Sequence, residues 1–213
     1  MCIRDRRDVA QPVNLSDLAP TFLKVAGLTV PAQMTAESLV GFFSGESESR
    51  QAAFIAMERH DGCRAGGKGY PCRAIRTKDY LYIHNFEPGR WPSGSPDKSV
   101  CARNIPFGEI DTSPTKSFMM QKRGQEAVSK LAELAFGMRP RVELYDVHAD
   151  PHQLNNLAGH PDITDIQTKM QNALFTHLRN TKDPRVVGGP ILWDYYPYYG
   201  TILTKGWKVD PQP

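Results

Sequence analysis

Two neighbouring strand-like segments constrain the fold of this chain more than any other feature. Residues 70–77 and 79–85 are separated by a tight turn at Lys78-Asp79, and the second segment reads YLYIH from position 80. An alternation with a period of two places one face of a strand inward, and strands joined by so short a turn pair antiparallel. The chain is therefore predicted to contain an antiparallel hairpin.

Further apolar segments extend this hairpin into a sheet. Residues 52–57 (AAFIAM) predict a short buried strand, and residues 141–145 (RVELY) predict another. Residues 163–180 carry an apolar stripe at helical spacing, suited to covering one face of the sheet. Short strands that are not joined by long helices favour antiparallel pairing. The pattern predicts an α+β fold, with a small four-stranded antiparallel sheet packed with helices.

Two more helices are expected outside this unit. The first begins at a cap, Asn14 or Ser16, and ends before Gly27. Its apolar face is formed by Leu15, Leu18, Phe22 and Val25. The second covers residues 125–136, with Val128, Leu131, Leu134 and Ala135 on one side.

The remaining segments predict irregular structure. Residues 41–50 are polar and read as a loop or domain junction, and residues 87–115 carry five prolines in a long irregular excursion. The aromatic and Pro-rich tail, residues 186–213, is expected to wrap the surface. Residues 1–7 are interpreted as a leader foreign to the fold, the alternative being that Met1 is the true start.

Charge and hydropathy exclude two classes of function. The 213 residues hold 26 Lys and Arg against 23 Asp and Glu, a net charge of only +3. A dedicated nucleic-acid-binding protein needs a concentrated basic face, so no nucleic-acid partner is expected. No window approaches the roughly 18 apolar residues of a membrane helix, so no membrane span is expected either.

The cysteines leave the redox compartment open. Apart from Cys2, the chain has Cys63, Cys72 and Cys101, with no CxxC spacing. One disulfide, such as Cys63–Cys72, can form in an oxidising compartment. Zinc binding by these cysteines with His60 is the weaker alternative, because their spacing matches no standard finger or ribbon.

A polar cluster directly after the strand at 52–57 is the main candidate for a functional site. Its members are Glu58, Arg59, His60 and Asp61, with Arg64 close behind and Arg73 on the next strand. Strand ends often carry site residues, and Arg and His suit an anionic ligand through bidentate and switchable hydrogen bonds. The alternative is a polar loop with internal Glu58–Arg59 or Asp61–Arg64 pairing.

Three groups of segments, in this order along the chain, carry a resemblance to a known family. They are residues 14–23 and 26–28, residues 70–71 and 73–83, and residues 143–146, 150–151 and 154–158. Together they resemble the sulfatase family, with heparan N-sulfatase-like (N-sulphoglucosamine sulphohydrolase-like) proteins as the most similar branch. The first group resembles a late helix of the catalytic domain, and the other two resemble the C-terminal subdomain.

The resemblance implies the C-terminal fragment of an alkaline-phosphatase-like sulfatase. Residues 8–50 would then be the end of the catalytic α/β domain, residues 51–185 the C-terminal subdomain, and residues 186–213 the tail. The implied partners are a missing N-terminal sulfatase domain and a sulfated sugar substrate. The family's compartments are periplasmic, secreted or lysosomal-type.

The family's cofactors are Ca²⁺ and a formylglycine made from the Cys or Ser of a C/S-x-P-x-R motif. This sequence has no such motif, so the modified residue and the metal ligands are expected outside it, and the fragment alone is expected to be inactive. Two alternatives stay open: a non-catalytic module that binds sulfated glycans or stabilises a partner domain, and a phosphonate or phosphate monoester hydrolase relative.

Overall fold

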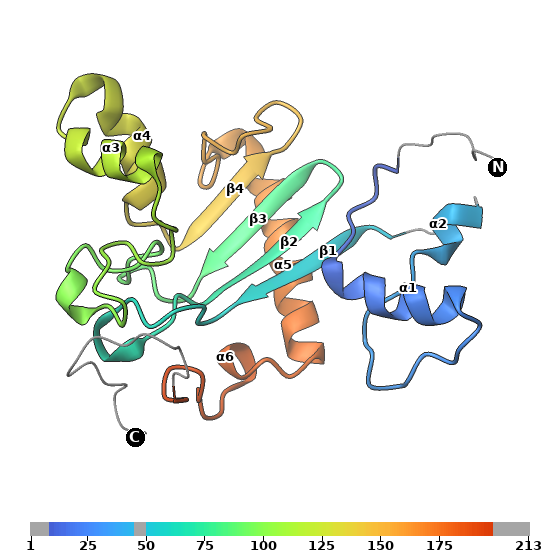
Figure 1. Cartoon of the computed structure of the whole chain (residues 1–213). Helices are drawn as coiled ribbons and strands as arrows, with labels where there is room; N and C mark the ends of the chain where they lie inside the picture. The colour runs from blue at the N-terminus through green and yellow to red at the C-terminus, as the bar shows by residue number, and fades with distance from the viewer. Residues whose placement is uncertain (1–8, 45–49, 198–213) are drawn as a thin grey trace, which may run out of the picture.

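A computed structural model describes residues 9–44 and 50–197 and contains one four-stranded antiparallel sheet (Figure 1). The strands lie in chain order, and the predicted α+β class is confirmed. They are β1 (Ala52–Met57), β2 (Cys72–Thr77), β3 (Tyr80–Asn85) and β4 (Val142–Asp146). The hairpin predicted around Lys78-Asp79 is the β2–β3 pair.

One row of side chains crosses the sheet and forms its buried face. The register pairs Phe54 with Ile75, Ile75 with Tyr82, and Tyr82 with Leu144. Helix α5 (Thr164–Asn180) lies across this face, as Figure 1 shows, and buries Met170, Leu174 and Leu178 against the row. The apolar stripe predicted for this helix is confirmed, because positions four residues apart share one helix face.

Strand β1 departs from the prediction of a short buried strand. It forms the edge of the sheet, and its side chains alternate between two faces. Phe54 packs toward the core, whereas Ile55 and Met57 are 45% and 41% exposed. The segment therefore forms an edge strand that is covered over residues 52–54 and exposed over residues 55–57.

A second, smaller core lies beside the sheet, formed by α3 (Pro114–Lys122) and α4 (Glu126–Phe136) with part of the excursion. Sequence reasoning missed α3, although Ser113 caps it and Pro114 occupies its first turn. The predicted apolar side of α4 is partly wrong, because Leu131 is 55% exposed. The buried positions are Val128, Ala132 and Phe136, which pack on Phe107 of the excursion.

The N-terminal region forms η1 (Leu15–Asp17), α1 (Leu18–Val25) and α2 (Val40–Ser44). Asn14 caps η1, and its Nδ2 also donates to the Phe54 carbonyl at 2.9 Å, which joins this region to β1. The loop prediction for residues 41–50 is wrong at its start, since residues 41–44 are helical, while residues 45–49 lie outside the described residues. Apolar side chains of η1 and α1 lie on the surface: Leu15 of η1 is 84% exposed and Phe22 of α1 66%.

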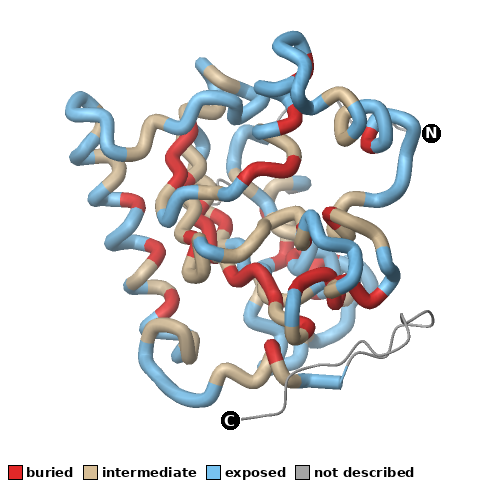
Figure 2. The backbone as a smooth tube through the Cα atoms, turned by 90° about the vertical axis from the view of Figure 1, so that its left-hand side faces the viewer, coloured by how far each residue is buried: buried red, intermediate tan, exposed pale blue. Residues whose placement is uncertain are grey.

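The excursion and the described part of the tail enclose the end of the sheet from which β1 exits. Between β3 and α3 the described chain is irregular except for η3 (Lys98–Val100), as predicted. After the turn α6 (Pro184–Val187), the tail runs to Pro197 and buries Asp194, whereas Tyr198 and Tyr199 lie outside the described residues. Figure 2 shows buried backbone gathered in the middle of the molecule with exposed segments around it.

None of the helices in the described ranges combines the length and the apolar character that a bilayer span requires.

Candidate functional site

The polar segment at residues 58–64 follows β1 directly and is contacted from four regions of the chain. Glu58 meets β2 and the α6 region, Arg59 meets the tail, and His60 to Arg64 meet the long excursion. All six residues predicted as site candidates lie in or beside this junction, but their environments differ.

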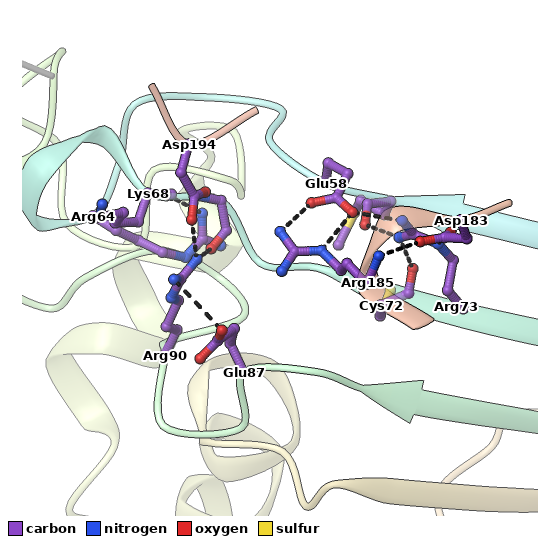
Figure 3. A network of polar contacts seen from close by, with 12 residues as sticks. Glu58, Arg64, Lys68, Cys72, Arg73, Glu87, Arg90, Asp183, Arg185 and Asp194 are labelled. Atoms are coloured by element: carbon purple, nitrogen blue, oxygen red, sulfur yellow. Dashed lines mark hydrogen bonds and ion pairs between the residues drawn. The ribbon is translucent and has the colours of Figure 1, made fainter. Parts of the chain in front are cut away.

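Glu58 and Arg73 belong to a buried network of ion pairs (Figure 3). Glu58 Oε1 accepts from Arg73 Nη2 at 2.6 Å and from Arg185 Nε at 2.7 Å, and its Oε2 accepts from Arg185 Nη2 at 2.6 Å. Arg73 Nε donates to Asp183 Oδ2 at 2.6 Å. The bidentate pair between Glu58 and Arg185 fixes the position and the direction of both side chains. Glu58 therefore anchors the segment at residues 58–64 to β2 and α6.

Arg73 is only 3% exposed, and its Nη1 donates to the carbonyls of Met57 and Cys72. Burial acts to lower its pKa, but the hydrogen bonds to Asp183 and Glu58 raise the pKa above its ordinary value, so the guanidinium stays charged. The structure places Arg73 inside the protein, and its predicted contact with substrate stays a prediction.

Arg59 contacts the tail. Its Nη2 donates to the Tyr196 carbonyl at 2.6 Å, and its Nη1 donates to the Gly67 carbonyl at 3.3 Å. Asp194, two residues before Tyr196, accepts from the Gly69 amide at 2.7 Å and from Arg90 Nη1 at 2.9 Å. The tail is therefore held against residues 59–69 by charged hydrogen bonds.

His60 is the accessible member of the cluster. Its side chain is 76% exposed, and its Nδ1 lies 2.7 Å from Glu109 Oε2. Glu109 Oε1 accepts from Arg64 Nη1 at 2.9 Å, and Arg64 is 4% exposed. Sequence reasoning missed Glu109, because an acidic residue in an irregular loop has no periodic or motif signal that would place it beside His60.

Asp61 lines a small pocket between the segment and the excursion. It is buried, accepts from the Gly62 amide at 2.7 Å, and lies 3.6 Å from Arg103 Nε. The pocket holds about 70 Å³ and is also lined by Cys63, Cys101 and Asp111. Ligand pockets measure roughly 300–1,000 Å³, so this one is too small to enclose a sugar.

The local pairing considered from the sequence is wrong. Glu58 pairs with Arg73 and Arg185 rather than Arg59, and Arg64 pairs with Glu109 rather than Asp61. The segment at residues 58–64 follows β1, and its side chains contact different parts of the fold. Glu58 and Arg64 therefore pair with residues that are distant in the sequence rather than with nearby residues of the segment.

The thiols form neither the disulfide nor the metal site considered above. Cys63 and Cys72 carry free thiols, and Cys101 Sγ donates to the Cys63 carbonyl at 3.3 Å. Among residues 9–44 and 50–197, no three His, Cys, Asp or Glu side chains are grouped closely enough to hold a metal ion. The described residues therefore offer no ligand set for zinc or for the calcium that the family resemblance implies.

No family model matches the sequence. Two curated proteins of Formosa agariphila, both described as ulvan-active sulfatases, are similar to it. One is 25% identical over 185 residues, which cover 85% of this chain and 32% of that protein. The other is 22% identical over 165 residues, covering 77% and 25% respectively. The chain thus spans about a third or less of the length of these relatives, which support the sulfatase resemblance but not the heparan N-sulfatase branch in particular.

Among solved structures, BT4656 in complex with its substrate D-glucosamine-2-N,6-O-disulfate aligns with a TM-score of 0.47 and 22% identity. The alignment covers 79% of this chain and 25% of that one.

Proposed function

We propose that this chain is the C-terminal part of a sulfatase, a sulfuric ester or sulfamate hydrolase acting on sulfated glycans. Within it, the chain supplies the small α+β subdomain and residues at the rim of the substrate site. The observation that carries the proposal is the similarity to two ulvan-active sulfatases over most of the chain. Heparan N-sulfatase-like proteins are the proposed branch, and a periplasmic, secreted or lysosomal-type compartment is the proposed location.

The geometry of the 58–64 segment supports a rim role for two side chains. His60 is exposed at the end of β1, and the half-buried Arg59 lies beside it, held by two backbone carbonyls. Imidazolium and guanidinium groups are suitable donors to sulfate oxygens. Glu58, Asp61, Arg64 and Arg73 are buried, or nearly so, and would act by holding these two side chains in place.

The catalytic step would be carried out by a preceding domain of the same protein. In the family, formylglycine supplies the nucleophile, and Ca²⁺ stabilises the sulfate charge. The described residues hold no group of three His, Cys, Asp or Glu side chains that could bind the calcium ion. Their part is to bind and orient a sulfated substrate.

The test uses the full open reading frame to which this chain belongs. The purified parent is assayed with ulvan, with D-glucosamine-2-N,6-O-disulfate and with an aryl sulfate, in the wild type and in the Arg59→Ala and His60→Ala variants. Loss of one charge-assisted hydrogen bond should lower kcat/KM about tenfold or more in both variants, with little change in Tm for His60→Ala, whose side chain is 76% exposed. His152→Ala, at an exposed histidine far along the chain, is the matched control.

Three outcomes would reject parts of the proposal. A parent that hydrolyses phosphonate or phosphate monoesters but no sulfate would place it in a different hydrolase class. Glycan binding without turnover by any form of the protein would favour the non-catalytic module. Unchanged kinetics in both variants would remove Arg59 and His60 from the rim.

A further inference from the structure

Glu109 links an exposed histidine to a buried arginine. One carboxylate oxygen is 2.7 Å from His60 Nδ1, and the other accepts from Arg64 Nη1 at 2.9 Å. The exposed fraction falls along this path, from 76% for the His60 side chain to 15% for Glu109 and 5% for Arg64. The histidine is therefore attached to the interior through a single carboxylate.

Arg64 provides a rigid base for this carboxylate. Its Nε donates to the Trp91 carbonyl at 2.6 Å, its Nη2 to the Pro92 carbonyl at 2.7 Å, and its Nη1 to the Lys68 carbonyl at 3.5 Å. A buried guanidinium with its donors fixed on main-chain carbonyls has little rotational freedom. The direction from which Glu109 approaches His60 is consequently set by backbone.

The excursion that carries Glu109 is also pressed closely against the segment that carries His60. The Ser95 amide donates to the Cys63 carbonyl, and the Ala102 amide donates to the Gly62 carbonyl, both at 2.7 Å. A Cβ on Gly108, the residue before Glu109, would lie only 2.8 Å from Cys63 Cβ. Glycine at this position permits the close approach that brings Glu109 within reach of His60.

We propose that Glu109 is a positioning residue that fixes the ring orientation and the tautomer of His60. A carboxylate paired with Arg64 can only accept hydrogen bonds, so Nδ1 of His60 must carry the proton. The neutral imidazole then presents an unprotonated Nε2, and no hydrogen bond joins that atom to the part of the chain that the structure describes. The same arrangement of carboxylate and histidine orients imidazoles in metal sites and catalytic triads.

The consequence for ligand binding rests on the proposed function. When His60 is protonated, its Nε2–H becomes a second donor on an exposed side chain, available to a sulfate oxygen. Glu109 would fix the orientation of the ring, and its carboxylate would pair with the imidazolium through Nδ1. The tautomer itself does not depend on what the parent protein hydrolyses.

The direct test is ¹⁵N NMR of the histidine side chains in the 213-residue chain, at a pH where His60 is neutral. In the wild type, Nδ1 of His60 should resonate as a protonated, pyrrole-like nitrogen and Nε2 as an unprotonated one. In Glu109→Gln, the amide oxygen should stay on Arg64 and the NH₂ group should face Nδ1, so the two assignments should exchange. A wild-type His60 protonated on Nε2 would overturn the proposal even if the variant fails to fold.

A kinetic test in the full-length parent separates positioning from general stability. Glu109→Gln should raise KM for a sulfated glycan about tenfold with a smaller change in kcat. In a His60→Ala background the same substitution should have no further effect, because residues that act as a unit are not additive. An equal loss in both backgrounds would assign Glu109 a structural role only. Glu87→Gln, the same exchange at an acid of the excursion whose side chain is 44% exposed, is the control.

Failure of the two proposals can be told apart. A parent without sulfatase activity but with the Nδ1–H tautomer in the wild type rejects the proposed function and retains the positioning role. A parent with sulfatase activity whose wild-type His60 carries its proton on Nε2 retains the proposed function and rejects the positioning role of Glu109.

Discussion

Glu58 and Arg185, which are 127 positions apart, form a bidentate ion pair at 2.6 and 2.7 Å that joins the end of β1 to α6. Arg185 also lies over the rings of Phe86 and Trp193. The guanidinium side chain is 7% exposed and the carboxylate 14%. This single contact connects the first strand, the segment after the last long helix and the aromatic tail.

Glu58→Gln should therefore destabilise the chain by roughly 2–4 kcal/mol, because it leaves the buried Arg73 and Arg185 without their shared carboxylate. Urea unfolding at neutral pH, read as a shift in the midpoint, measures the effect. Glu87→Gln is the matched control, since Glu87 is 44% exposed and 3.8 Å from Arg90, and it should cost less than about 1 kcal/mol. Equal midpoints for the two variants would contradict the structural role of the pair.

Two histidines should make the fold sensitive to acid. His177 stacks on Phe54 with ring centroids 3.6 Å apart, and burial lowers its pKa. Burial, and then the nearby Arg141, lower the pKa of His84. Since the unfolded chain binds protons at a higher pH than these groups do in the fold, stability should fall as the pH drops below about 6.5. The loss is complete below the folded pKa values.

The change from His84 to Phe should reduce this slope, because Phe retains the ring contacts with Phe86 and Phe175 but does not titrate. His152→Phe, the same exchange at an exposed position, should leave it intact. The measurement is the urea midpoint between pH 7 and pH 5. If the urea midpoint of His84→Phe fell with pH as steeply as that of the wild type, His84 would not contribute to the acid sensitivity.

The buried thiols should resist modification in the native state. Cys63 and Cys101 are each 1% exposed. Burial, followed by the charges of Asp61 and Asp97, raises the pKa of Cys101 to about 11. Burial likewise raises the pKa of Cys72 to about 11. At pH 8 the thiolate fraction is then lower by about two orders of magnitude than for an ordinary cysteine.

An aromatic disulfide reagent should accordingly react with these three thiols at least about a hundredfold more slowly in native than in urea-unfolded protein. The experiment uses a Cys2→Ser background, so that only these positions contribute. Rapid native labelling of Cys63 or Cys101, located by mass spectrometry, would be inconsistent with their burial.

The exposed apolar face of α1 should promote self-association of the 213-residue chain. Phe22 is 66% exposed, and Leu18 and Val25 of the same helix and Leu15 of η1 are exposed as well. Contiguous apolar surface of this kind favours association. Phe22→Lys should shift light-scattering mass toward the monomer without lowering Tm. Leu154→Lys, at a leucine 48% exposed elsewhere, should not, and an equal shift in both would deny the face a specific role.

The strands and α5 were predictable because their signals are local. A period of two marks β3 over six residues, and positions four apart mark the buried side of α5. The start of α3 was also present as Ser113-Pro114 but was obscured by its position at the end of an irregular, Pro-rich stretch. The buried side of α4 was harder to predict from the sequence. Leu131 has the more apolar side chain, yet Ala132 is buried, because Phe107 of the excursion packs there.

The location of the candidate site could be predicted from the sequence, whereas the partners of its residues could not. Its location after β1 and the residue types His60 and Arg59 could be inferred from the sequence, since polar residues at a strand end are recognisable without a structure. Its partners could not. Glu109, Asp183, Arg185 and the Tyr196 carbonyl reach residues 58–73 only through the fold.

The amino-acid sequence alone determined the class of this protein: an antiparallel hairpin, its extension to four strands, and the amphipathic helix that covers one face. Periodic burial is a property of neighbours along the chain, so it can be read from them. Only the tertiary structure decided which charges meet. Ion pairs are formed by side chains that approach within a few ångströms, and that proximity is created by sheet register and loop packing rather than by any order in the sequence.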